Sequence, residues 1–199
     1  MVFRPTTFAA ALAHVFPETL AASGDSLTYG YLVRAGYLAR VEKSLRTRFP
    51  ASALTVRNEG VCGATAEDGL RRFDHDVAPA RADLLLVQYG LNDAFERLPV
   101  SAFATALEGL VDRQRALRPD GEIVLVPPPV LPVPAEERVV QPYREALCQV
   151  GAARGALVAP VAERWPARAP HLFLADRVHP TDEGHQLLAD AVLEALLGP

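Results

Sequence analysis

Three residues of this sequence combine a suitable type with a position that could serve nucleophilic catalysis. Ser26 lies in the stretch 24–28, Gly-Asp-Ser-Leu-Thr, where a predicted strand turns into a helix whose N-terminus would face a developing negative charge. Asp176 and His179 are three residues apart on a predicted turn. The carboxylate can therefore reach the imidazole Nδ1–H and leave Nε2 free as a base. Taken separately, such residues are more often helix caps or solvated turn residues.

Two further segments could stabilise an oxyanion. The stretch 58–65 holds Gly60 and Gly63 in a loop before a helix, and such a loop can present a backbone N–H to a negative charge. Asn92 follows an apolar run, and its side-chain amide can donate a hydrogen bond without titrating. The plainer alternatives are a βα turn and a helix cap. Only the combination of all these segments favours a catalytic interpretation.

The elements that must position these residues are predicted from alternating patterns. Short apolar runs predict strands at 19–23, 54–58, 84–87, 123–126 and 156–159. Helical periodicity covers 31–49, a segment with Leu70, Phe73 and Val77 on one side, 103–117, 136–153, and a last helix from about 181. This alternation predicts an α/β fold of three layers, with a five-stranded parallel sheet of flavodoxin-like order flanked by helices. Active sites of such sheets lie beyond the carboxyl ends of the strands.

The motifs together resemble those of a known family. Gly-Asp-Ser-Leu at 24–27, Gly63 in its loop, Gly-Leu-Asn-Asp at 90–93, and Asp176-x-x-His179-Pro180 occur in the order and approximate spacing of the SGNH, or GDSL, hydrolases. The resemblance runs from about residue 19 to the end and includes all four blocks of the family. It implies the SGNH hydrolase fold and the hydrolysis of esters.

The resemblance also implies a role for each motif residue. Ser26 would be the nucleophile, and His179 the general base and later the general acid. Asp176 would orient His179 and stabilise its imidazolium form. The oxyanion hole would consist of the Ser26 N–H, the Gly63 N–H and the side-chain amide of Asn92.

Other residues near these motifs are given supporting roles. Asp25 and Asp93 are interpreted as braces of their loops. A proline-rich segment, 127–134, follows the fourth predicted strand and would emerge on the same side of the sheet as the site. It could form one wall of a substrate pocket or be only a stiff connection. The candidate substrate-binding residues are Phe95, Leu98, Val130 and Leu131.

Composition limits the remaining possibilities. The chain has 199 residues, and 20 Lys and Arg against 24 Asp and Glu leave a net charge of -4, which argues against nucleic acid as a partner. The length favours a single domain, 1–199, in which 1–18 is an N-terminal extension leading into the first strand. An interrupted apolar stretch at 7–16 and the lack of a run of about 20 apolar residues predict a cytoplasmic protein without a membrane span. The oligomeric state stays open.

No cofactor or metal is expected. The glycines at 60 and 63 do not continue into a phosphate-binding or dinucleotide-binding fingerprint. Asp74, His75 and Asp76 are adjacent and would point in different directions at a helix end, so a solvated turn is favoured over a metal site. His14, His171 and His185 lack the spacing of metal ligands.

The sequence therefore predicts a serine hydrolase that cleaves carboxylic esters of short to medium acyl chains through an acyl-enzyme. A thioesterase, a lysophospholipase or a carbohydrate O-acetylesterase could use the same residues. A catalytically silent binding module on the same fold is the alternative from another class of protein.

Overall fold

A parallel sheet forms the centre of the molecule. The computed structural model describes residues 6–13, 17–166 and 169–198. The five strands run in the order β2-β1-β3-β4-β5, with every neighbouring pair parallel. Their bounds are β1 Pro17–Gly24, β2 Ala53–Gly60, β3 Leu84–Gln88, β4 Glu122–Leu125 and β5 Leu157–Val158. The predicted α/β fold and flavodoxin-like order are confirmed.

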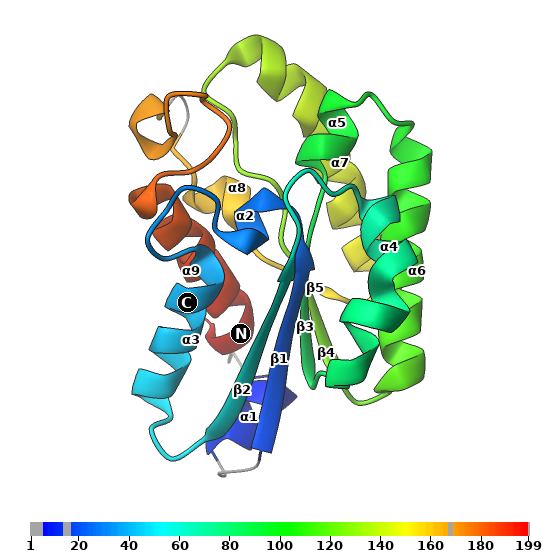
Figure 1. Ribbon diagram of the computed structural model, residues 1–199, viewed down its shortest axis with the longest axis vertical. Helices are drawn as coiled ribbons and strands as arrows, with labels where there is room; N and C mark the ends of the chain where they lie inside the picture. The colour runs from blue at the N-terminus through cyan, green and yellow to red at the C-terminus, as the bar shows by residue number, and fades with distance from the viewer. Residues whose placement is uncertain (1–5, 14–16, 167–168, 199) are drawn as a thin grey trace.

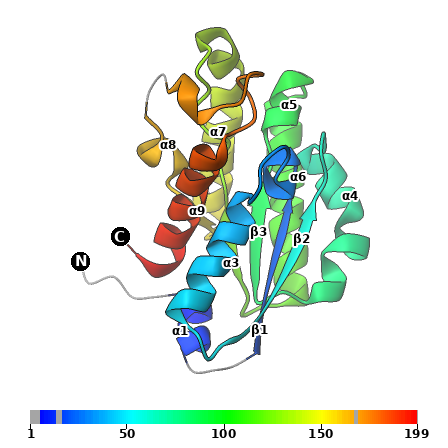
Figure 2. The ribbon, with the colours of Figure 1, turned by 60° about the vertical axis from the view of Figure 1, so that its left-hand side comes forward.

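Helices cover both faces of this sheet (Figures 1 and 2). On one face α3 packs against α9, and α1 contacts both β1 and α9. On the other face α6 lies between α4 and α7. The bounds of these helices are α1 Thr7–Ala13, α3 Tyr37–Arg48, α4 Ala66–Asp76, α6 Val100–Leu117, α7 Pro134–Arg154 and α9 Asp182–Leu197. The shorter elements are α2 Ser26–Tyr29, α5 Leu91–Phe95, α8 Val161–Arg164, and the 3-10 turns η1 Ala78–Ala80 and η2 Pro170–Leu172.

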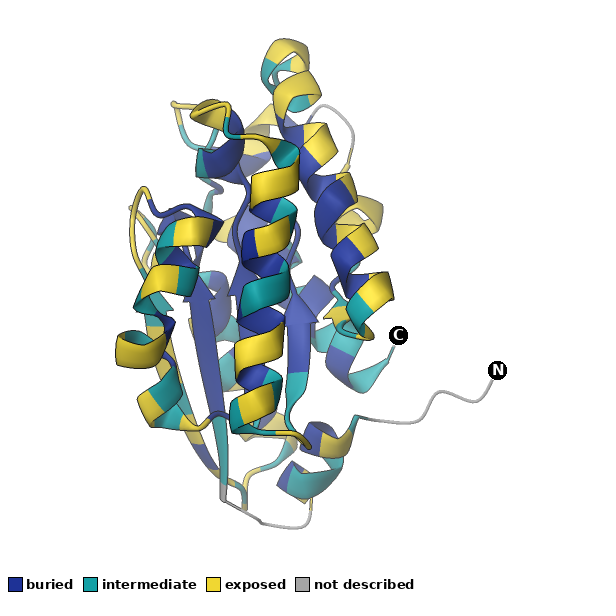
Figure 3. Cartoon of the chain, turned by 90° about the vertical axis from the view of Figure 1, so that its right-hand side faces the viewer, coloured by how far each residue is buried: buried dark blue, intermediate teal, exposed yellow. Residues whose placement is uncertain are grey.

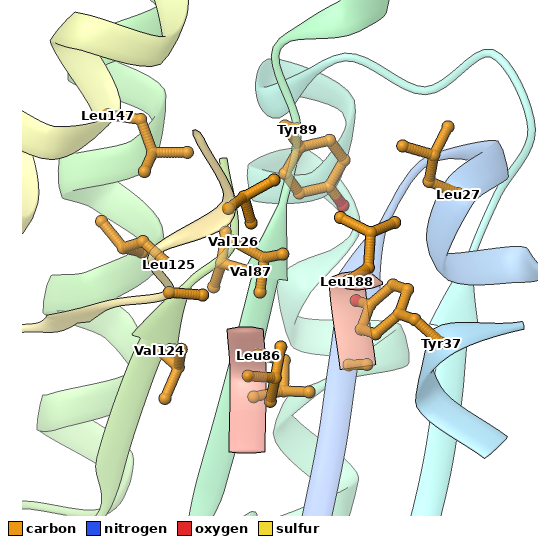
Figure 4. Packing of buried hydrophobic residues seen from close by; sticks show 14 of the residues in the cluster. Leu27, Tyr37, Leu86, Val87, Tyr89, Val124, Leu125, Val126, Leu147 and Leu188 are labelled. Carbon is orange, nitrogen blue, oxygen red and sulfur yellow. The ribbon is translucent and has the colours of Figure 1, made fainter. Parts of the chain in front are cut away.

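The hydrophobic core lies on both sides of the central strands. Every residue of β3 is buried, as expected of a strand with helices on each face. Leu147 of α7 and Leu188 of α9 both point into this core (Figure 4). The outer helices carry buried residues on the side facing the sheet and exposed residues on the other, which appears as alternating colours along each helix in Figure 3. The buried apolar residues form one cluster.

One helix is shorter in the structure than the sequence predicted. The helix predicted over 31–49 begins only at Tyr37, with Gly36 as its N-cap. Leu32 has a φ of 58°, a left-handed conformation that an α-helix cannot include. Residues 31–36 therefore form a loop beyond α2, and the prediction of a helix over these residues is wrong.

The N-terminal part of the chain adds a helix that the sequence patterns did not predict. Phe8 and Leu12 of α1 are buried in the core. Residues 1–5 and 14–16 of the predicted extension, including His14, lie outside the described residues. Within the described ranges, no helix combines the length and the apolar character needed to cross a membrane.

The carboxyl ends of three strands meet in register. Gly24 of β1 is paired with Gly60 of β2 on one side and with Gln88 of β3 on the other. The loops that leave these strands carry Ser26, Gly63 and Asn92. Figure 1 shows α2, α5 and the segment before α9 together at this end of the sheet. The topology thus places the sequence motifs at the carboxyl end of the sheet.

Candidate active site

Ser26 is the first residue of α2, immediately beyond β1. Asp25 is the N-cap of this helix, and its Oδ1 accepts a hydrogen bond from the Leu27 N–H at 2.8 Å. Gly24 lies so close to Thr28 that a Cβ added to it would be 2.1 Å from the threonine Oγ1. Glycine is therefore required where the strand turns into the helix. Ser26 itself is 8% exposed.

A chain of hydrogen bonds joins Ser26 to His179 and Asp176. The distance between His179 Nε2 and Ser26 Oγ is 2.9 Å, and that between His179 Nδ1 and Asp176 Oδ2 is 2.8 Å. Since a carboxylate can only accept hydrogen bonds, Nδ1 carries a proton in this arrangement. Nε2 is then left to accept a hydrogen bond from the serine hydroxyl. The arrangement can deprotonate the hydroxyl and stabilise the resulting imidazolium.

The turn before α9 fixes the aspartate relative to the histidine. Asp176 Oδ1 accepts hydrogen bonds from the N–H groups of Val178 at 2.9 Å and His179 at 3.0 Å. The His179 carbonyl accepts from the Leu174 N–H at 2.8 Å, which closes the turn. Partial burial raises the pKa of Asp176, but the two backbone hydrogen bonds and the interactions with the His179 side chain together outweigh it, so the net pKa is lowered. Asp176 is therefore an anion across the neutral pH range.

The loop after β2 is tied to the end of β1 and to α5. The Val61 N–H donates to the Gly24 carbonyl at 3.0 Å, and the Asn92 side-chain amide donates to the Ala64 carbonyl at 2.9 Å. Gly63 lies between these ties with a φ of 80°, and no atom lies within 4 Å of the position of an added Cβ. Gly63 is thus exposed to solvent. Asn92 keeps a second N–H beyond the one that holds this loop.

Asp93 anchors the segments on either side of Asn92. Its carboxylate accepts from the Ala66 N–H at 3.0 Å and from the Gly90 N–H at 3.1 Å, which links α5 to the N-terminus of α4. Burial raises the pKa of Asp93 to about 6, although these hydrogen bonds act to lower it. The contacts agree with the bracing role inferred from the sequence.

A buried polar network lies beneath α2. Asp25 Oδ2 accepts from Gln88 Nε2 at 3.4 Å, and Gln88 Oε1 accepts from Thr28 Oγ1 at 3.1 Å. The Thr28 and Tyr37 hydroxyls are 3.0 Å apart. Asp25 is fully buried, which raises its pKa to about 7 even though the Leu27 and Gln88 hydrogen bonds act to lower it. This network ties β1, β3 and α3 together under the serine.

The candidate substrate-binding residues differ in accessibility. Phe95, at the end of α5, is 40% exposed, whereas Leu131 is 3% exposed and belongs to the core. Leu98 and Val130 are half-buried. The Leu98 carbonyl accepts a hydrogen bond from the Tyr143 hydroxyl, so the loop after α5 is held against α7. Phe95 offers more apolar surface than the other three.

The family follows from a match along most of the chain. Residues 22–187 match the model of the GDSL-like Lipase/Acylhydrolase family. The chain belongs to this family. The matched segment contains Ser26, Asn92 and His179, which carried the resemblance seen in the sequence. The predicted family is thereby confirmed, and with it ester hydrolysis as the family's chemistry.

Relatives of this GDSL-like hydrolase include enzymes with different names. It is 30% identical over 184 residues to a GDSL lipase of Mycobacterium tuberculosis, covering 87% of this chain and 79% of that protein. It is 25% identical over 178 residues to an acetylxylan esterase of Geobacillus stearothermophilus (81% and 80%), and 23% over 186 residues to an arylesterase of Vibrio mimicus (90% and 88%). A solved acetylxylan esterase from Geobacillus stearothermophilus has the same fold, with a TM-score of 0.79, 22% identity, and coverage of 92% and 96%.

Sequence patterns gave no signal for two contacts, one at the GDSL-like site and one in the proline-rich segment. The Tyr31 ring lies against His179, although the periodicity had placed Tyr31 in a helix. Arg144 of α7 donates to the carbonyls of Pro128 and Pro129, each at 2.9 Å, and pairs with Glu137. Both contacts join segments that are distant in the sequence, which periodicity cannot predict.

Among residues 6–13, 17–166 and 169–198, no group of three or more His, Cys, Asp or Glu side chains is placed to hold a metal ion. In the stretch from Asp74 to Asp76, the carboxylate of Asp76 contacts His75 and Arg72.

Proposed function

We propose that this protein hydrolyses carboxylic esters with Ser26 as the nucleophile. The observation that carries the proposal is the pair of hydrogen bonds from Ser26 Oγ to His179 Nε2 and from His179 Nδ1 to Asp176. A catalytically silent module would have no reason to hold a serine hydroxyl 2.9 Å from an imidazole whose other nitrogen faces a carboxylate.

In the acylation step, Ser26 Oγ attacks the acyl carbon of the ester while its proton passes to His179 Nε2. The negative charge on the former carbonyl oxygen is stabilised by the N–H groups of Ser26 and Gly63 and by the free N–H of Asn92. The bond between the acyl carbon and the alcohol oxygen then breaks. The departing oxygen takes the proton from His179 Nε2 and leaves as the alcohol.

Deacylation repeats these transfers with water. His179 Nε2 removes a proton from a water molecule as its oxygen attacks the acyl carbon of the acyl-enzyme. The bond to Ser26 Oγ breaks, the serine recovers its proton from His179, and the carboxylic acid is released. Asp176 stays an anion throughout and stabilises the imidazolium in both steps.

The proposed substrates are small esters with short to medium acyl chains, and Phe95 is the proposed apolar contact beyond the site. Hydrolysis of an O-acetyl group on a carbohydrate is the second candidate, because an acetylxylan esterase is among the relatives and shares the fold. Thioesters and lysophospholipids stay open as further substrates of the same residues.

The cytoplasmic location stays a prediction. We also propose that the chain works as a single catalytic domain, since its buried apolar residues form one cluster.

Turnover of p-nitrophenyl acetate tests the proposed function. The wild-type protein is expected to release p-nitrophenol well above the rate of Ser26→Ala, because the variant keeps the site but lacks the nucleophile. Equal rates for the two proteins would contradict the proposal. Acetyl, octanoyl and palmitoyl esters, an acyl-CoA and acetylated xylan then separate the substrate classes.

A further inference from the structure

Tyr31 places an aromatic ring against the proposed general base. The ring centroids of Tyr31 and His179 are 4.8 Å apart, and the ring planes are tilted by 50°. Tyr31 is nevertheless 37% exposed. Part of the ring therefore covers the imidazole, while the rest offers an aromatic surface to whatever molecule occupies the site.

The backbone holds this residue in a fixed relation to the nucleophile. The N–H groups of Gly30 and Tyr31 both donate to the Ser26 carbonyl at 3.0 Å. The next residue, Leu32, is 69% exposed and has a φ of 58°. For a residue with a Cβ, this left-handed conformation costs about 1 to 2 kcal/mol, and burial of the leucine does not offset it. The turn thus presents Leu32 to solvent, one residue after the ring that lies against His179.

In the reaction proposed above, the alcohol is the part of the ester that must lie at His179. The departing oxygen takes its proton from Nε2, so the group attached to that oxygen leaves next to the imidazole and its neighbours. We propose that Tyr31 determines specificity for the alcohol part of the ester, forming a subsite that favours an aryl alcohol. The inference rests on the proposed function and names the substrate class of the same site.

The chemistry of the turn favours an aryl group over a sugar. An aromatic leaving group can pack against the Tyr31 ring in a tilted or offset geometry, which contributes about 0.5 to 1.5 kcal/mol beyond burial of its area. A sugar would need hydrogen-bonding partners for its hydroxyls. Leu32, the next side chain, has none, so the Tyr31 hydroxyl is the one such group on these two side chains.

Two acetyl esters isolate this contact. Phenyl acetate and ethyl acetate form the same acetyl-enzyme, so deacylation is common to both and the alcohol influences kcat/KM through acylation alone. The rates are followed by acid release in a pH-stat for wild type, Tyr31→Ala, Tyr31→Phe and Tyr29→Ala. Tyr29 is the matched control, because it is an exposed tyrosine (60%) two residues away on the same segment. Acetylated xylooligosaccharide serves as the sugar substrate.

We expect Tyr31→Ala to lower the ratio of kcat/KM for phenyl acetate to that for ethyl acetate about tenfold, the equivalent of about 1.4 kcal/mol. Tyr31→Phe and Tyr29→Ala should keep the wild-type ratio, because the first retains the ring and the second leaves Tyr31 in place. If Tyr31 had a purely structural role, Tyr31→Ala would lower kcat/KM for both substrates by the same factor and leave the ratio unchanged.

Three results would overturn the inference: an unchanged ratio in Tyr31→Ala, an equal fall in Tyr29→Ala, or a greater loss with the acetylated xylooligosaccharide than with phenyl acetate. Failure of the proposed function has a different signature, namely equal rates of wild type and Ser26→Ala on phenyl acetate. An active wild type with an unchanged ratio in Tyr31→Ala therefore removes only the inference about the alcohol.

Discussion

Replacing Asp25 by asparagine is expected to weaken the pH dependence of the protein's stability. The Asp25 carboxyl lies fully buried beneath Ser26, and burial raises its pKa from 3.8 to about 7. Hydrogen bonds from Leu27 and Gln88 lower that pKa, and the negative charge of Asp93 raises it, but burial is the largest of these effects. Asparagine has nearly the same shape and does not titrate.

The direction follows from the proton that each state holds. Between pH 3.8 and pH 7, the folded protein retains a proton on Asp25 that the unfolded chain has released. Raising the pH through this window therefore lowers the free energy of unfolding. The folded state holds at most one more proton than the unfolded chain, and this difference summed over the range from about pH 4.5 to about pH 8 is equivalent to one proton over about 2.4 pH units. At about 1.4 kcal/mol per proton and pH unit, this amounts to about 3 kcal/mol.

Urea unfolding at several pH values measures this contribution. The wild-type protein, Asp25→Asn and the control Asp120→Asn, an exposed aspartate in the turn before β4, are compared from about pH 4.5 to about pH 8. Asp25→Asn should lose about 3 kcal/mol less than wild type over this range, whereas the control should follow wild type. Asp93 and His185 titrate in all three proteins, so their effects cancel. Parallel curves for wild type and Asp25→Asn would refute the reasoning.

Substitutions at three other residues have expected effects on activity or on stability. Asn92→Ala should lower kcat for p-nitrophenyl acetate about 100-fold to 1000-fold with little change in KM, because the lost donor acts on the oxyanion. Burial lowers the pKa of His185 from 6.5 to about 4, so acidification through that window should cost wild type about 3 kcal/mol in urea unfolding, a loss absent from His185→Gln. Arg144→Met should lower the free energy of unfolding by about 3 to 5 kcal/mol, because it removes the positive charge that pairs with Glu137 and the donors to the two proline carbonyls, and an unchanged melting temperature would contradict this.

Local patterns were sufficient for the strands and for most of the helices. The apolar run at 84–87 predicted β3 because a central parallel strand is buried on both faces, and all of β3 is buried. Helical periodicity extended one helix back to residue 31, because Val33 shares the apolar spacing of the residues from Tyr37 onward. Periodicity cannot detect a left-handed residue, and the φ of Leu32 ends the helical geometry there.

Predicting the site required knowledge of contacts between residues that are distant in the sequence. The spacing of Asp176 and His179 indicated their hydrogen bond, because three residues on a turn lie close in any fold. The contact of His179 with Ser26 joins positions 153 residues apart, and it was expected only through the order of the family motifs. Contacts such as that of Gln88 with Asp25 require knowledge of which strands are neighbours, here β1 and β3. No local pattern supplies this.

Labelling with a fluorophosphonate tests most directly whether Ser26 is the nucleophile. The reagent forms a stable bond with an activated serine, and mass spectrometry of the intact protein and of its peptides locates the adduct. We expect a single adduct on Ser26 in the wild-type protein, none in Ser26→Ala, and much slower labelling in His179→Ala, where the hydroxyl has lost its base. An adduct on another residue, or equal labelling of wild type and Ser26→Ala, would contradict the assignment.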